Sequence, residues 1–564
     1  MEIIANKGIG NMIMQNWLRQ NRKSVIFLTI AILVLIAWYN RFILDDAFIG
    51  FRYARNLAQG NGLVWNVGEY VEGYTNFLWT ILMSLSFIFG IDPIIFSYIL
   101  GLIFFTLSLW FSYKLMELLL QSSTQAILGI ILLGTNYTFS SYATSGLETQ
   151  MQAFLFVISI YYLIKFVQGE RNFKLLFSLS LLESAAMLTR PDSFILIFIT
   201  SIVIIWVLIK NYDDKKIIIQ KSSYFFLPMI LIIGIWLVWK ISYYGSIIPN
   251  TYYAKTVNIV YIFGIYYLHK FFTVYFFFPE LIMLILLIPS IIRRRYYSII
   301  ILISLVFLWL AYIIKIDGDF MEFRFIVPIM PFIILLTIWL LFEIINQKIV
   351  RITLITCIFL ADIYHCVASA GIGSHKKFRM FLGGQIETIP QLADHLESYE
   401  KDWDTIGKKL RKYFGDSSDV IIATSAAGAI PYYSGLRTID MIGLNDKWIV
   451  HNGVIRSGSS SAHRFQSPLS YLVRRKTNII IGHPKIYSKK LATDGYNSFS
   501  EFQKSIMKSK LRFLYLDCEF PKSAKVLGIP IDSDRTLFTI YLTPNKTVDK
   551  MIARYGWKTY PISQ

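Results

Sequence analysis

Apolar runs of about 20 residues, the length that crosses a bilayer as a helix, recur through the first two thirds of this chain. The mean hydropathy is +0.52, and 55% of the 564 residues are hydrophobic. This pattern predicts a polytopic α-helical membrane protein. Eleven runs are clear, at residues 24–44, 94–113, 125–143, 149–168, 173–189, 193–210, 224–243, 272–292, 298–315, 325–346 and 351–368.

A further apolar segment, Asn76–Ile91, is at the short end for a span. If it stays on the outer side as an interfacial or re-entrant helix, the basic clusters all fall on one face of the membrane, as the positive-inside rule requires. We therefore expect a cytoplasmic N-terminus, a transmembrane domain with a first outer loop, and a tail on the outer side. Their bounds are 1–23 for the N-terminus, 24–368 for the transmembrane domain, 45–93 for the loop and 369–564 for the tail.

The tail has ordinary globular composition and alternates between strand-like and helix-like patterns. It predicts a small α/β cap domain. The expected strands are 419–423, 477–482, 511–516 and 537–542, and the expected helices are 391–413 and 499–509.

The net charge of +19 is spread over many short loops and the tail, without the basic stripe or stacking motif of a nucleic-acid binder. An anionic membrane surface or a phosphate-bearing lipid is the expected partner. Three cysteines are too few for a disulfide framework, and the histidines lack zinc-ligand spacing. We find no glycine-rich phosphate loop, dinucleotide fingerprint or nucleophile elbow.

Asp45 and Asp46 stand where the first span leaves the membrane. Burial and mutual repulsion there should raise the pKa of one carboxyl or recruit a cation, and either outcome suits a general base. The alternative is a solvated loop in which Asp46 caps a helix. Residues 48–58 predict an amphipathic helix in the membrane interface, with Arg52 and Arg55 on its polar face.

Other polar residues gather on the outer loops under the same topology. Simple alternatives exist for several: Glu148 could cap a helix, Arg190 could pair locally with Asp192, and Lys255 could snorkel to the interface. The dense charge between Asp317 and Arg324 is harder to dismiss. An arginine or lysine facing outward at this depth could hold a lipid phosphate.

The run Asp45–Asn66, followed by Glu72–Trp79, closely resembles the bacterial membrane glycosyltransferases related to the terminal arabinofuranosyltransferase of the actinobacterial envelope. These enzymes belong to the GT-C superfamily. The resemblance covers nearly the whole chain in order. It continues through Gly146–Thr149, Leu188–Pro191, Tyr244–Gly245, Pro249–Lys255, Asp317–Asp319, Ala427–Gly435 and Thr438–Asp446.

The resemblance implies a GT-C fold of about eleven transmembrane helices with an extracytoplasmic cap, in the bacterial inner membrane with the cap in the periplasm. It also implies an inverting enzyme whose donor is a polyprenyl-phosphate sugar and whose acceptor is an envelope glycan: lipopolysaccharide, polysaccharide or glycoprotein. No cofactor is certain, although a divalent cation could take part.

By the same resemblance, Asp45 matches the catalytic base, and Asp46 orients the acceptor or holds the metal ion. The remaining candidate residues would contact the sugar or the donor phosphate. They are Arg52, Arg55, Glu72, Tyr74, Asn76, Glu148, Arg190, Asp192, Asn250, Tyr252, Tyr253, Lys255, Asp317, Asp319 and Arg324.

The chain departs from its relatives at Asp192-Ser193, where they carry Glu-Gly, and at Phe323-Arg324-Phe325, where they often carry paired arginines. Its abundance of Ile, Lys, Asn, Phe and Tyr is also unlike that of a high-GC actinobacterium, so arabinose is not assumed as the sugar. Two other functions stay open: a transporter or flippase for a lipid-linked glycan, and a non-catalytic assembly factor. Transporters usually place charges near the bilayer midplane in repeated halves. Here the acids gather at outer helix ends and no half-repeat is found.

Overall fold

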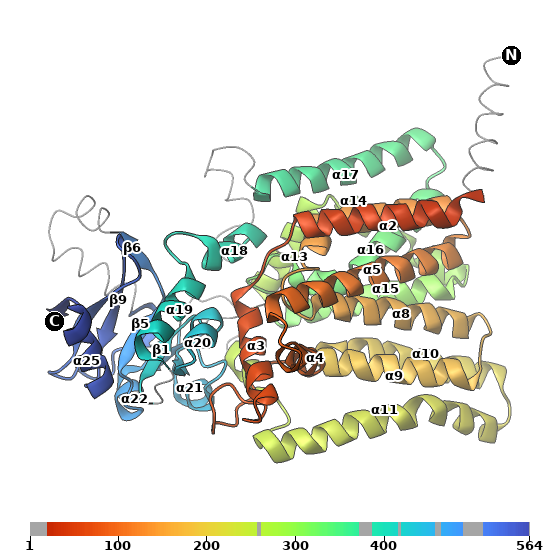
Figure 1. Ribbon diagram of the computed structural model, residues 1–564. Coiled ribbons are helices and arrows are strands. Elements are labelled where there is room, and N and C mark those ends of the chain that lie inside the picture. The colour runs from red at the N-terminus through yellow and green to blue at the C-terminus, as the bar shows by residue number, and fades with distance from the viewer. Residues whose placement is uncertain are drawn as a thin grey trace.

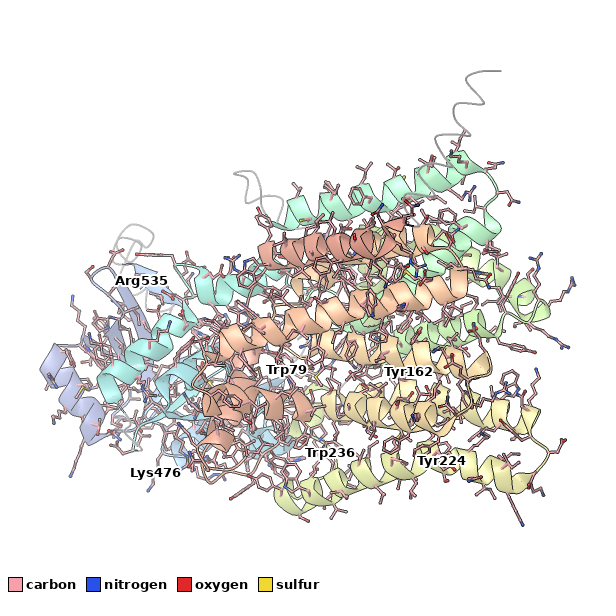
Figure 2. The ribbon with its side chains drawn as sticks, turned by 45° about the vertical axis from the view of Figure 1, so that its right-hand side comes forward. Trp79, Tyr162, Tyr224, Trp236, Lys476 and Arg535 are labelled. Carbon is pink, nitrogen blue, oxygen red and sulfur yellow. The ribbon has the colours of Figure 1, made fainter. Side chains whose placement is uncertain are left out.

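The computed structural model describes residues 20–256, 261–370, 386–415, 419–456, 464–488 and 511–562. Long, roughly parallel helices form a bundle, and a mixed α/β part lies at one end of it (Figure 1). Trp79 and Trp236 lie toward that end of the bundle, whereas Tyr162 and Tyr224 lie toward the other (Figure 2). The prediction of a polytopic helical protein with an α/β tail is confirmed.

Several of the bundle helices begin at a side-chain cap. Asp92 accepts hydrogen bonds from the backbone N–H groups of Ile94 and Ile95, and Asp214 accepts one from Lys216. The helices are α2 (Arg22–Tyr39), α5 (Pro93–Leu120), α6 (Ser123–Thr135), α7 (Tyr137–Ser141), α8 (Thr149–Val167), α9 (Phe173–Thr189), α10 (Phe194–Asn211), α11 (Lys215–Tyr244), α13 (Ile262–Val274), α14 (Phe278–Arg293), α15 (Tyr297–Lys315), α16 (Met330–Trp339) and α17 (Lys348–Ala370).

Every one of the eleven predicted spans corresponds to helix, but not all are full spans. Among the described residues, eight helical segments are long and apolar enough to cross a membrane, and the α13–α14 pair adds a ninth if its 107° bend lies within one span. The other two are α6, with 13 residues, and α9, with 17. Helix α4 (Phe77–Ile88) has only 12 residues, which agrees with its expected failure to span.

Helix α3 (Asp45–Ala58) differs from the predicted interfacial helix. It lies between the bundle and the α/β part (Figure 1), and most of its residues are buried, on both of its faces. Its arginines face protein rather than the membrane surface because the α/β part covers the side that was expected to meet water.

The main sheet of the α/β part has the strand order β10-β8-β9-β5-β1-β2, with β6 paired to β9. Strand β1 runs parallel to β2 and β5, and β9 runs antiparallel to β5 and β8. The strands are β1 (Ile421–Thr424), β2 (Arg437–Asp440), β5 (Ile479–Gly482), β6 (Ile486–Ser488), β8 (Lys525–Pro530), β9 (Arg535–Tyr541) and β10 (Thr559–Pro561).

A smaller sheet, β3-β4-β7, and several helices complete this part. The four predicted strands correspond to β1, β5, β7 and β9, the predicted helix 391–413 divides into α18 and α19, and 499–509 lies outside the described residues. The elements are β3 (Val454–Ile455), β4 (Phe465–Pro468), β7 (Leu514–Tyr515), α18 (Ile389–Glu397), α19 (Trp403–Phe414), α20 (Ala429–Ser434), α21 (Lys447–Asn452), α22 (Leu469–Arg474) and α25 (Lys546–Tyr555).

Candidate active site

A cavity of about 540 Å³, here called the main cavity, opens among the loops at the end of the bundle that meets the α/β part. Its wall comes from α3, the loop before α4, the start of α8, the α9–α10 connection, α11, the short α12 (Asn250–Lys255) and the turn after α15. The α/β part contributes Leu444. The charged residues that line the cavity are Asp46, Glu148, Arg190, Asp192, Lys240, Lys255, Asp319 and Arg324.

Arg190 holds two acids of the main cavity. Its Nη1 lies 2.8 Å from Glu148 Oε1, and its Nη2 lies 2.7 Å from Asp192 Oδ2. Asn76 Nδ2 donates to the other oxygen of Glu148 at 2.7 Å. Burial raises the pKa of Glu148, but Arg190 and Arg324 outweigh it, so the pKa lies below its usual value. The local Arg190–Asp192 pair expected as a simple alternative is therefore present, within a larger network.

Arg324 pairs with Asp319, with 2.8 Å between Nη2 and Oδ2. Its Nε is buried and has no hydrogen-bond partner in the described part of the chain. A buried guanidinium N–H without an acceptor is costly, and an anionic ligand would satisfy it.

Asp46 and Lys255 differ from the other charged residues of the main cavity. For neither does the described part of the chain provide a hydrogen bond or an ion pair within bonding distance, although each acts on the other electrostatically. Burial raises the pKa of Asp46, while Lys255 and Arg324 oppose the rise. Burial also lowers the pKa of Lys255, and neighbouring Arg324 lowers it further. One carboxyl and one ammonium group thus remain available to a ligand.

Asp45 lies beside the main cavity but does not line it. Its carboxylate accepts hydrogen bonds from the backbone N–H groups of Ala429, at 2.8 Å, and Gly428, at 3.2 Å. A Cβ on Gly428 would lie 1.9 Å from the Asp45 carbonyl oxygen, so only glycine permits this approach. Burial raises the pKa of Asp45 to about 6 despite the two N–H donors. Asp45 joins α3 to the α/β part.

Arg52, Arg55 and Asp317 also lie outside the main cavity. Arg52 donates to the carbonyls of Trp65, at 2.7 Å, Pro431, and Leu436, at 2.8 Å. These carbonyls are out of reach of water, so the guanidinium is committed to them. Arg55 donates to the Tyr432 carbonyl, and Asp317 pairs with Arg464 at 3.0 Å. The structure thus gives these three predicted ligands of substrate other partners.

The remaining candidates divide between two cavities. Tyr74 and Tyr252 line the main cavity, as does Asn76. Glu72, Asn250 and Tyr253 line a second cavity of about 200 Å³ beside it.

Lys240 was not predicted from the sequence as a site residue, although it lines the main cavity. Its Nζ lies 2.9 Å from Glu72 Oε2, and both side chains are buried. Burial raises the pKa of Glu72 to about 7, and Lys240 limits the rise. The signal was available, because a lone lysine within an apolar span is rarely without a function.

Asp46 was also a candidate metal ligand. No group of three or more His, Cys, Asp and Glu side chains suited to a metal ion is found over the described ranges. The donor set around Asp46 does not fit a divalent cation, because the charges nearest to it include Lys255 and Arg324, and Asp319 is already paired with Arg324.

Comparisons with known proteins place this geometry in context. Residues 391–525 match a family described as a domain of unknown function, DUF8728. The terminal β-(1→2)-arabinofuranosyltransferase of Mycobacterium tuberculosis is 27% identical over 232 residues, which are 39% of this chain. The match spans 36% of that relative's length.

Two solved structures of ArnT from Cupriavidus metallidurans are similar over 93% of this chain. The apo structure has a TM-score of 0.54 at 9% identity and is covered over 100% of its length. The structure bound to undecaprenyl phosphate has a TM-score of 0.51 at 8% identity and is covered over 99%. The chain therefore has the fold of the GT-C membrane glycosyltransferases, as the resemblance in its sequence implied.

Proposed function

We propose that the protein is an inverting glycosyltransferase of the bacterial inner membrane. It moves a sugar from a polyprenyl-phosphate donor to an envelope glycan on the periplasmic side. The observation that carries this proposal is the main cavity, in which the described chain leaves Asp46 and Lys255 without bonding partners and Arg324 Nε without an acceptor. The names of the relatives support it, because one transfers an arabinofuranosyl group and one was solved with undecaprenyl phosphate.

Asp46 is the general base of the proposed reaction. It takes the proton from the acceptor hydroxyl, and the oxygen attacks the anomeric carbon on the side opposite the phosphate. The bond between that carbon and the phosphate oxygen breaks, its electron pair leaves with the phosphate, and the configuration inverts. Lys255 and the Nε of Arg324 stabilise the charge of the leaving phosphate.

Asp45 keeps a different role in this proposal from the one that the resemblance implies. Both of its carboxylate oxygens accept backbone hydrogen bonds, from Gly428 and Ala429, and it does not line the main cavity. A base must lie within hydrogen-bond reach of the proton that it removes, and the lining of the main cavity does not include Asp45. Asp45 is therefore a positioning residue that fixes the first turn of α3, and with it Asp46.

The test compares Asp46→Asn with Asp45→Asn in membranes supplied with defined polyprenyl-phosphate sugars. We expect Asp46→Asn to lower the transfer rate by roughly 10²- to 10⁴-fold, the usual loss on removal of a general base. Asp45→Asn should retain measurable transfer, because an amide oxygen can still accept one backbone hydrogen bond. Transfer is read as the mass gain of the glycan, and a normal gain in Asp46→Asn would refute the assignment of the base.

One observation favours a transporter or flippase as the second candidate. Glu183 of α9 and Glu280 of α14 lie buried in apolar helices, where ionisable groups often mark a transport path. Proteoliposomes decide between the two functions. A flippase would move a fluorescent lipid-linked sugar across the bilayer even with Asp46→Asn, whereas the proposed transferase would not move it in either form.

A further inference from the structure

The second cavity lies where three segments of the chain meet. Residues 70–72 follow α3, residues 244–253 run from the end of α11 into α12, and α21 belongs to the α/β part. The cavity is therefore complete only when the α/β part is docked. Its lining residues are Tyr70, Val71, Glu72, Tyr244, Gly245, Ser246, Ile248, Asn250, Tyr253, Lys447 and His451.

A thin wall separates this second cavity from the main cavity. The backbone N–H of Asn250 donates to the carbonyl of Glu72 at 3.0 Å and ties the two segments together. Glu72 lines the second cavity, whereas Gly73, the next residue, lines the main cavity. Tyr252 and Tyr253 divide in the same way. A ligand that fills both cavities would need to cross only one layer of residues.

The Glu72–Lys240 ion pair crosses this wall. Glu72 faces the second cavity, and Lys240 lines the main cavity, 2.9 Å away. The pair neutralises the carboxylate at the floor of the second cavity, so the cavity does not select for a cation. Glu72 still presents a strong hydrogen-bond acceptor, which a hydroxyl group can use.

The rest of the lining combines aromatic rings with hydrogen-bonding groups. The Tyr253 ring lies 5.2 Å from the His451 ring, centre to centre. Asn250 Nδ2 donates to the carbonyls of Gly443 and Leu444, which leaves its Oδ1 as an acceptor. A sugar ring offers hydroxyls that both donate and accept, and apolar C–H faces that pack against aromatic rings. The lining matches that chemistry.

We propose that the second cavity binds one uncharged sugar residue of the acceptor glycan, adjacent to the residue whose hydroxyl enters the main cavity. This assignment to the acceptor rests on the proposed transferase function. The cavity would fix the register of the acceptor, so that one hydroxyl reaches Asp46. It would thereby select the glycan that is extended.

The experiment measures equilibrium binding of sugars to the full-length protein in nanodiscs without any donor lipid. The probes are the methyl glycosides of arabinofuranose, glucose, galactose, mannose and N-acetylglucosamine. Their binding is measured by saturation-transfer NMR. We expect at least one of them to bind, and Tyr253→Ala to weaken it roughly tenfold or more. The matched control is Tyr252→Ala, whose side chain lines the other cavity and which should leave sugar binding within about twofold.

His451→Ala is the second variant, because His451 is exposed and its removal should not affect folding. It should weaken the same probe. Absence of binding by every probe, or binding that Tyr252→Ala abolishes and Tyr253→Ala does not, would overturn the proposal. Binding of inorganic phosphate through Lys447, in place of the sugars, would also overturn the proposal. Because no donor is present and no turnover is measured, these outcomes are independent of the transfer assay on Asp46.

Discussion

At the scale of single residues, adjacent side chains in this protein have unrelated tasks. Consecutive residues of an α-helix point about 100° apart, so a single step along α3 separates Asp45, bonded to the α/β part, from Asp46, in the main cavity. Tyr252 and Tyr253 of α12 are separated in the same way, because Tyr252 lines the main cavity and Tyr253 lines the second cavity. Substitutions at neighbouring positions should therefore give different phenotypes.

The pH profile of transfer should report Asp46. A general base works only when deprotonated, so activity should fall as the pH decreases through the pKa of its carboxyl. Burial raises that pKa, and the acid limb should therefore lie above the ordinary aspartate value of 3.8. The profile is measured on membranes at saturating donor. An acid limb at the ordinary value, or one that persists in Asp46→Asn, would contradict this assignment.

The stability of the protein should report Asp45 separately. The fold holds a proton on this carboxyl more tightly than the unfolded chain does, with a pKa of about 6 against 3.8. Its contribution to stability is then complete below pH 3.8 and decreases as the pH rises through 6. Melting temperatures from pH 4 to 7 should fall more steeply for the wild type than for Asp45→Asn. Parallel curves would count against this pKa.

At the scale of elements, helix α3 is held between the two parts of the molecule by polar contacts at close range. At Gly428 the backbones approach so closely that no side chain fits, since any Cβ there would meet the Asp45 carbonyl, a backbone atom that cannot move aside. The contact lies at the start of α20, where the backbone N–H groups of Gly428 and Ala429 donate hydrogen bonds to the Asp45 carboxylate.

Gly428→Ala should therefore separate α3 from α20 and abolish transfer, while the bundle still inserts. Gly234→Ala is the matched control, because a Cβ on Gly234, within α11, would meet nothing within 4 Å. We expect the control to be as active and as stable as the wild type. Activity and protease resistance are measured for both variants, and wild-type behaviour of Gly428→Ala would disprove the close contact.

The wall between the two cavities depends on the Glu72–Lys240 pair. Lys240→Met should destabilise the protein by about 3–5 kcal/mol, because it leaves a buried carboxylate without a partner. The double variant Lys240→Met, Glu72→Gln should recover most of that loss. The free energy of unfolding is compared across the four members of this cycle. A loss in the double variant equal to the sum of the two single losses would show that the pair is not coupled.

At the scale of the whole molecule, the sequence was sufficient for the helical bundle and for part of the α/β tail. Span positions follow from local periodicity, and each corresponds to helix, although α6 and α9 are shorter than full spans and the α13–α14 pair is bent by 107°. Of the ten strands in the described residues, only β1, β5, β7 and β9 were predicted. Which residues line the main cavity and which join the two parts of the molecule was not predictable. Asp45 meets Gly428, 383 residues away, and no local pattern encodes such a contact. The helix that contains Arg52 was predicted to be interfacial for the same reason. The partners of Arg52 are Pro431 and Leu436, which are distant in the sequence.

The orientation in the membrane can be tested with the native thiols. Cys518 is exposed in the α/β part, whereas Cys357 and Cys366 are only partly exposed in α17. After Cys357→Ser and Cys366→Ser, we expect a membrane-impermeant maleimide to label Cys518 in spheroplasts. A cysteine introduced at Arg294, exposed at the opposite end of the bundle, should be labelled only after lysis. The reverse pattern would invert the proposed topology.

The hydrogen bonds from Gly428 and Ala429 to Asp45 also bear on how the protein is made. The ribosome synthesises α3 long before α20, and all the bundle helices except α2 are made between the two. During that interval the first turn of α3 lacks the partners that orient Asp46 in the proposed mechanism. A nascent or truncated chain in the membrane would therefore be unable to consume the lipid-linked donor, and catalytic competence would arrive only with the final stage of translation.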